Sequence, residues 1–122
     1  MKQETIFVEV FGKSPIVRLL DFLITYQAFD YPLTEIAEKA GVSYSTLQTF
    51  WAKLVENKIV LKTRRVGKSD LYKLNTKNPA VQQLIKLDWN LIHGAEMHQN
   101  TKSALVERYR NQAHTDLALL NE

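Results

Sequence analysis

Apolar positions follow helical spacing in the long segments of the chain and alternate in a few short ones. From Ile16 to about Tyr26 they fall on one broad face, which predicts a core helix. Ser14 and Pro15 precede this face and suit the N-cap and the first position of a helix. Residues 4–11 instead alternate with period two and carry apolar side chains on both faces, which predicts a strand. We expect that strand to pair with another, because a short strand alone cannot satisfy its own backbone groups.

Two shorter helices are predicted next, joined by a tight turn. Pro32 disfavours helix at the residue before it, so we expect a brief extended piece ahead of Thr34, which suits the N-cap of the first helix. Gly41 then ends that helix, and Ser43 suits the N-cap of a second one at residues 44–57. The apolar positions of both helices predict a helix-turn-helix; they are Ile36, Ala37, Ala40, Leu47, Phe50, Trp51 and Leu54.

A hairpin is predicted over residues 59–74. The extended pattern of residues 59–65 leads into a turn at 66–69, and residues 70–74 return as a second strand. The predicted fold class is therefore mainly α with a small antiparallel β-sheet, an α+β fold.

Residues 78–122 have a separate helical pattern. Pro79 opens it, and apolar residues then recur near steps of three and four. Gly94 and the polar run at 98–102 weaken the pattern, so both one long helix and two shorter ones fit. Each half must bury its apolar stripe to be stable. The first half can cover the main domain, which we expect at residues 1–77, but the second half needs a partner.

A second copy of the chain is the natural partner for this C-terminal extension. The alternative is an antiparallel helical pair that folds back on the core of the same chain. A homodimer would suit a protein that binds two-fold symmetric sites. The residues expected at the dimerisation interface are Leu105, Tyr109, Ala113, Leu117 and Leu120.

Positive charge is concentrated in the middle of the chain. Residues 44–75 hold seven Lys or Arg against two Asp or Glu, a net charge of +5, whereas residues 1–43 carry −2 and residues 76–122 are neutral. This localisation favours contact with a polyanion; a solvated basic hairpin is the alternative. The 122 residues suffice for one core. The chain lacks cysteine, a signal-like start and an apolar run near the roughly 20 residues that span a bilayer, so we expect a cytoplasmic protein with no membrane partner.

Three pieces of the chain occur in a specific order and spacing: FGKSPIVRLLDFL, LTEIAEKAGVSYSTLQTFWAKLVENKIV and TRRVGKSDLYKLN. Together they resemble the winged helix-turn-helix regulators, and more narrowly the small MarR/ArsR-like winged-helix proteins common in archaea and their mobile elements. The resemblance covers residues 11 to about 75. One position departs from it: Lys58 stands where the family usually has a glycine, before the first strand of the wing, and lysine leaves a helix less comfortably there.

The resemblance implies that the helix at residues 44–57 enters the major groove of DNA. The hairpin at 59–74 would then act as a wing on an adjacent minor groove or on phosphates. The polar residues that could reach base edges from the start of this helix are Tyr44, Ser45, Gln48 and Thr49. Gln48 is the strongest candidate, because a glutamine can make a bidentate contact to adenine. For each of the four, the alternative is an ordinary exposed helix residue.

Long cationic side chains are expected to neutralise phosphates and so to supply affinity without sequence information. These residues are Lys53, Lys62, Arg64, Arg65 and Lys68. Arg64 or Arg65 could also enter a narrow minor groove. Alternation along a strand puts these two on opposite faces, so we expect only one of them to face DNA, and the pattern leaves open which.

Neither a catalytic site nor a metal site is predicted. His93 and His98 are five residues apart on a helix, which separates them by about 140° around its axis. The acidic residues, Asp21 and Asp30 among them, have no accompanying nucleophile or glycine-rich phosphate loop. We therefore expect neither an enzyme nor a bound cofactor.

The sequence thus predicts a sequence-specific, dimeric protein that binds double-stranded DNA and regulates transcription. A winged helix used as a protein-interaction or assembly module is an alternative from a different class. A plasmid or viral replication or partition factor is a further alternative, which would also bind DNA and differ only in the location of its site.

Overall fold

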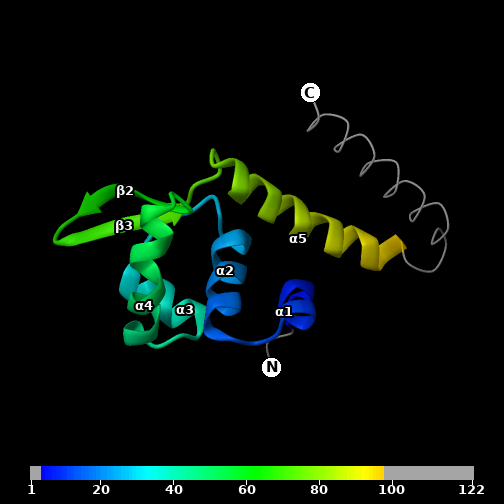
Figure 1. The fold of residues 1–122 in the computed structure, drawn as a ribbon. Coiled ribbons are helices and arrows are strands. Elements are labelled where there is room, and N and C mark those ends of the chain that lie inside the picture. The colour runs from blue at the N-terminus through cyan, green and yellow to red at the C-terminus, as the bar shows by residue number, and fades with distance from the viewer. Residues whose placement is uncertain (1–3, 98–122) are drawn as a thin grey trace. The chain divides into compact units, whose positions relative to one another are not determined.

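A computed structural model describes residues 4–97 of the chain. Within them, helices dominate and three short strands form one antiparallel sheet (Figure 1), which confirms the predicted fold class. In chain order the elements are α1 (Ile6–Phe11), α2 (Pro15–Thr25), β1 (Tyr31–Pro32), α3 (Leu33–Ala40), α4 (Tyr44–Glu56), β2 (Val60–Val66), β3 (Ser69–Leu74) and α5 (Pro79–Met97).

α1 is a helix, so the strand predicted at residues 4–11 is wrong. Thr5 caps this helix, because its Oγ1 accepts a hydrogen bond from the backbone N–H of Val8 at 3.3 Å. Phe7 and Phe11 lie one turn apart, with ring centroids separated by 5.0 Å. Apolar side chains on both faces fit a strand and a short helix equally well, and here the cap and the aromatic pair favour the helix.

The core lies where α2, α3 and α4 pack against one another and against the sheet. α2 buries Leu19, Phe22, Leu23 and Ile24, as the predicted core helix requires. The inner faces of α3 and α4 are buried as well, although Phe50 of α4 is only half-buried. The largest fully buried side chains are Leu19, Ile36, Leu47, Leu74, Val60 and Val81.

α3 begins one residue earlier than its predicted cap. Pro32 occupies the N-cap position with extended backbone angles, so the assignment of Thr34 as the cap is wrong. The reason is that Pro32 also pairs with Leu71 of β3. The chain therefore passes directly from strand to helix, and Thr34 lies exposed in the first helical turn.

α3 and α4 end with the same backbone motif. After each helix one residue enters the left-handed region, with a φ of 72° at Gly41 and 58° at Lys58. The N–H of the following residue then reaches back five residues to a helix carbonyl, at 2.9 Å in both cases. Glycine adopts this conformation freely, whereas it strains a lysine. The departure at Lys58 therefore raises the energy of the turn while leaving its path unchanged.

The sheet has the strand order β1-β3-β2. The short extended piece predicted before α3 is its edge strand, in which Tyr31 pairs with Tyr72. β2 and β3 form the hairpin predicted at residues 59–74, and Gly67 supplies a left-handed residue at its turn, with a φ of 60°. This arrangement holds the hairpin beside the start of α3.

Asn78 fixes the start of α5, where Pro79 is the first helical residue as predicted. Its Oδ1 accepts a hydrogen bond from the N–H of Ala80, and its Nδ2 donates to the carbonyl of Lys58, both at 2.9 Å. Val81 then packs into the core with almost no exposed surface. The start of α5 is thus tied to the turn that follows α4.

The chain divides into two compact units within α5. The first unit ends at Asp88, and the second begins at Trp89, whose ring lies 3.9 Å from that of His93 between centroids. Gly94 lies inside α5, so the helix does not break there. The residues predicted for dimerisation lie outside the described range: Leu105, Tyr109, Ala113, Leu117 and Leu120.

Candidate nucleic-acid interface

α4 is fixed at its start and along its inner side. The side-chain oxygen of Ser43 accepts a hydrogen bond from the N–H of Thr46 at 3.2 Å, as predicted for the N-cap. Leu47 and Trp51 are buried. Trp51 also meets Tyr72 of β3 edge to face, with ring centroids 5.4 Å apart. These contacts set the rotation of α4 about its axis and leave its opposite side in solvent.

Polar side chains cover the outer side of α4. The four predicted base-reading residues are all exposed: Tyr44, Ser45, Gln48 and Thr49. The hydroxyl of Thr49 donates to the carbonyl of Thr46 at 2.6 Å, so its proton is already engaged within the helix. The side-chain amide of Gln48 forms no hydrogen bond with any residue between 4 and 97. Gln48 therefore presents both a donor and an acceptor outward.

A bulge in β2 determines which cations share a face of the hairpin. Lys62 pairs with Tyr72 of β3, and Arg64 pairs with the adjacent Leu71. Thr63 is consequently an extra residue that has no counterpart on β3. The simple alternation expected along the strand is shifted by one residue at this point.

Arg65 and Lys62 lie on the same side of the hairpin as a result. Arg65 pairs with Asp70, and Asp70 shares a face with Tyr72, the partner of Lys62. That face meets α4, because Tyr72 contacts the helix there. Arg64 lies on the opposite face, so the two adjacent arginines point to different sides of the hairpin.

Asp30, just before β1, holds Arg64 on that opposite face. The Nε and Nη2 of Arg64 donate to the two carboxylate oxygens of Asp30 at 2.9 and 3.2 Å, and the hydroxyl of Thr63 donates to it at 2.6 Å. These bonds, chiefly those from Arg64, lower the pKa of Asp30 to about 2. Arg64 and the bulged Thr63 thus fasten the hairpin to the segment before β1.

Asp70 lies between the two cations on the face toward α4. The Nζ of Lys62 is 3.2 Å from its Oδ1, and the Nε of Arg65 is 4.0 Å from the same atom. This oxygen has almost no exposed surface, and within residues 4–97 it accepts no hydrogen bond. Its two ion pairs are therefore its main compensation for lost hydration.

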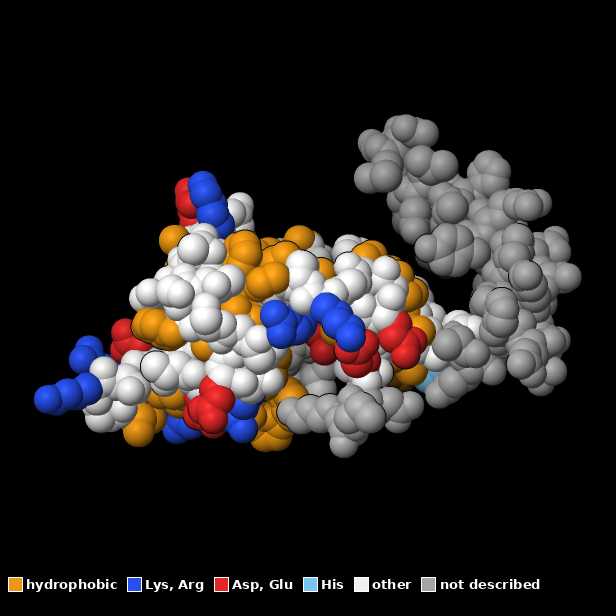
Figure 2. Space-filling model, turned by 90° about the horizontal axis from the view of Figure 1, so that it is seen from below, with side chains coloured by type: hydrophobic (Ala, Val, Ile, Leu, Met, Phe, Trp, Pro, Cys, Tyr) orange, Lys and Arg blue, Asp and Glu red, His pale blue; other side chains and the backbone are white. Residues whose placement is uncertain are grey.

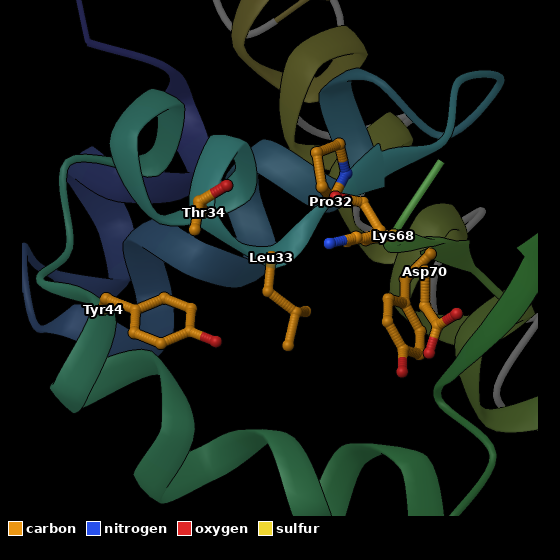
Figure 3. A pocket seen from close by; sticks show the side chains of 8 residues that line it. Pro32, Leu33, Thr34, Tyr44, Lys68 and Asp70 are labelled. Atoms are coloured by element: carbon orange, nitrogen blue, oxygen red, sulfur yellow. The ribbon is translucent and has the colours of Figure 1, made fainter. Parts of the chain in front are cut away.

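A groove of about 250 Å³ separates the hairpin turn from the starts of α3 and α4. Tyr44 and Lys68 point into it from opposite sides, with Leu33 between them and Asp70 at one edge (Figure 3). Lys68 makes no ion pair with any residue in the described part of the chain. A cation and a phenol hydroxyl facing one groove are suited to donate to an anionic oxygen.

Lysine and arginine side chains project at the hairpin end of the described surface, with acidic side chains among them (Figure 2). The remaining predicted phosphate contact, Lys53, is exposed on α4, and its Nζ lies 3.6 Å from the Oε2 of Glu56.

Among residues 4–97, no group of three or more His, Asp or Glu could hold a metal ion. In the same range, no helix is long and apolar enough to cross a membrane.

Solved structures share this arrangement of helices and hairpin. The AntR antimony-specific transcriptional repressor is 24% identical, covers 66% of this chain and 68% of its own, and has a TM-score of 0.50. ZitR from Lactococcus lactis, in the apo form of a double mutant, is 14% identical over 94% of this chain and 89% of its own, with a TM-score of 0.56. The fold is a winged helix. A MarR-family transcriptional regulator from Silicibacter pomeroyi adds a third winged helix, 20% identical over 93% of this chain and 75% of its own, with a TM-score of 0.50.

No family model and no curated protein matches the chain.

Sequence reasoning located the outer side of α4 and the cations of the wing, but it missed the two acidic residues that organise the wing. Asp30 and Asp70 carry no local signal of this role, because their partners depend on the bulge at Thr63 and on the pairing of β1 with β3. The sequence alone shows only that Asp70 is a negative charge within a basic segment.

Proposed function

We propose that this winged-helix chain is a sequence-specific protein that binds double-stranded DNA as a homodimer and regulates transcription in the cytoplasm. One observation carries the proposal. Tyr44, at the start of the exposed polar side of α4, lines one groove with Lys68 and Asp70 of the wing. Further along α4, Trp51 contacts Tyr72 on the wing face that carries Lys62 and Arg65. A polar helix next to a cationic ribbon suits a major groove and its flanking phosphates.

Each part has a distinct role in this proposal. Gln48 reads a base edge in the major groove, because its amide points outward without a partner in the described residues. Lys62, Arg65 and Lys68 neutralise phosphates or enter the minor groove, whereas Arg64 positions the wing through Asp30. Tyr44 contacts a phosphate at the groove beside Lys68.

Two further observations support a dimeric regulator. The AntR structure is that of a transcriptional repressor, and the Silicibacter pomeroyi structure is that of a transcriptional regulator. In α5, Trp89 is 61% exposed and Ile92 is 40% exposed. Large apolar side chains exposed on one helix favour contact with another protein surface.

Selection of bound sites from a pool of random duplex DNA tests the proposal. We expect enrichment of one motif with two-fold symmetry and half-sites about one helical turn apart. Gln48→Ala should chiefly reduce the preference for that motif over unrelated DNA, by on the order of 1–3 kcal/mol for each base that the glutamine reads. The matched control is Gln83→Ala, because Gln83 is also an exposed glutamine but lies on α5, away from the proposed interface. This change should leave the motif unchanged.

Two outcomes of this selection would contradict the proposal. Enrichment of no motif would argue against sequence-specific recognition. Failure to retain duplex DNA at near-physiological salt would favour the alternative of a protein-interaction module.

A further inference from the structure

Asp70 places a negative charge inside the surface proposed to meet the phosphates of DNA. It lines the groove beside the wing turn and lies on the same face as Lys62 and Arg65. A phosphate that approaches these cations is repelled by the carboxylate at close range. An acidic residue at this position therefore lowers affinity for any DNA.

The contacts of Asp70 make this repulsion a competition for the same cations. Its Oδ1 lies 3.2 Å from the Nζ of Lys62 and 4.0 Å from the Nε of Arg65. The atom has almost no exposed surface, so water does not replace these partners while the wing keeps this conformation. A phosphate that captures Lys62 and Arg65 would leave this covered oxygen without a cation, which costs free energy, although the Asp70 side chain as a whole is 36% exposed.

We propose that Asp70 is an internal competitor of the DNA backbone that weakens binding to duplexes of every sequence. In the free protein it occupies the two wing cations, and DNA must displace it from them. At a given protein concentration, only a duplex whose bases also contact the outer side of α4 then stays bound, so Asp70 raises the affinity that a site must supply. This inference rests on the proposed DNA-binding function and adds a residue that sets the overall affinity for duplex DNA.

The chain offers a matched control on the other face of the wing. Asp30 also binds a wing cation, with a bidentate contact to Arg64 at 2.9 and 3.2 Å. That pair lies on the face opposite Lys62 and Arg65. Removing the charge of Asp30 changes the net charge of the protein by the same amount as removing that of Asp70. It frees no cation on the face toward α4, however.

The test compares Asp70→Asn with Asp30→Asn and with Glu9→Gln, a charge change at an exposed residue of α1. Binding to a duplex of unrelated sequence is measured by fluorescence anisotropy between about 50 and 200 mM NaCl. Asp70→Asn should bind about three to ten times more tightly at about 0.1 M salt, with a plot of log affinity against log salt steeper by about one to two. The other two variants should show no such gain. Affinity for a selected site should rise by a similar factor, because every duplex must displace the same carboxylate.

The outcomes separate this inference from the function on which it rests. If the wild-type protein shows no salt-dependent binding to any duplex, the proposed function is wrong. If the wild-type protein binds but Asp70→Asn gains nothing, or Glu9→Gln gains as much, the role of Asp70 is wrong. Thermal unfolding verifies that each variant is folded. If Asp70→Asn does not fold, the test is repeated with Asp70→Thr, because threonine suits a strand.

Discussion

Lys58 adopts a conformation that suits a glycine, and its neighbours keep it there. Its φ of 58° lies in the left-handed region. Its carbonyl accepts hydrogen bonds from the side chains of Asn75 and Asn78, each at 2.9 Å. Such a residue persists in a strained conformation only where surrounding contacts determine the path of the chain. The turn after α4 therefore carries strain in its lysine and support from the two asparagines.

Lys58→Gly should stabilise the protein. A left-handed conformation costs a residue with a Cβ about 1–2 kcal/mol, and the greater freedom of glycine in the unfolded chain offsets about 0.4–1 kcal/mol of this. We expect a net increase of about 0.5–1 kcal/mol in the free energy of unfolding, measured with urea. Lys58→Ala removes the same charge but keeps the strain, so it should show no comparable increase. Equal stabilisation by both variants would assign the effect to charge instead.

Asp30 makes the stability of the protein depend on pH in the acid range. Its pKa is lowered from 3.8 to about 2 by its bonds to Arg64 and Thr63. A carboxyl group with a lowered folded pKa stabilises the native state fully above its unfolded pKa, and that contribution is lost as pH falls through the folded value. The pair with Arg64 should therefore contribute fully above about pH 4 and progressively less toward pH 2.

Urea unfolding of Asp30→Asn between pH 7 and pH 2.5 tests this dependence. The variant should be less stable than the wild-type protein at pH 7, and the difference should shrink as pH falls below about 4. Glu38→Gln, which removes a charge from an exposed residue of α3, should follow the wild-type curve. A difference between Asp30→Asn and wild type that stays constant down to pH 2.5 would rule out the ionised pair as its cause.

The wing is an element whose chemistry depends on one inserted residue. Without the bulge at Thr63, alternation would place Lys62 and Arg64 together and Arg65 on the other side. With it, Lys62 and Arg65 share the face toward α4, and Arg64 turns to Asp30. Two adjacent arginines therefore divide into one that faces the proposed DNA and one that secures the hairpin.

Arg65→Ala and Arg64→Ala should have different effects on DNA binding. Arg65→Ala should weaken binding to all duplexes and reduce the slope of log affinity against log salt by about 1. Arg64→Ala should leave that slope nearly unchanged and lower the melting temperature, because it breaks the contact with Asp30. Anisotropy titrations across salt and thermal unfolding measure the two quantities. A larger loss of slope in Arg64→Ala would reverse the assignment of the two faces.

Periodicity predicted the elements whose pattern spans several turns or a full hairpin. α2, α4, the hairpin and the start of α5 all lie where their apolar spacing and capping residues predicted them. It failed at α1, where six residues with apolar side chains on both faces did not distinguish a helix from a strand. It could not place Arg64 and Arg65, because a bulge is fixed by pairing across the sheet and not by the residues of one strand.

At the scale of the whole molecule, the proposed function requires two copies of α4. A single α4 of 13 residues contacts few base pairs, whereas two helices related by a two-fold axis read two half-sites and gain affinity from each other. The apolar stripe predicted for this pairing lies beyond residue 97. Its role as the dimer interface is therefore a proposal that depends on the sequence pattern.

Replacing Leu105 and Tyr109 by glutamate tests the dimer directly. Burying two charges from each chain at an apolar interface would cost more than the contact supplies, so we expect monomers in sedimentation velocity at micromolar concentration. Asn111→Glu with Thr115→Glu adds the same charge at positions that a helical repeat of 3.6 residues places away from the stripe, and should leave the dimer intact. The monomer should also bind a symmetric duplex more weakly, because the second half-site no longer adds affinity. A dimer that survives the change at Leu105 and Tyr109 would exclude this stripe as the interface, and a wild-type monomer would exclude the dimer itself.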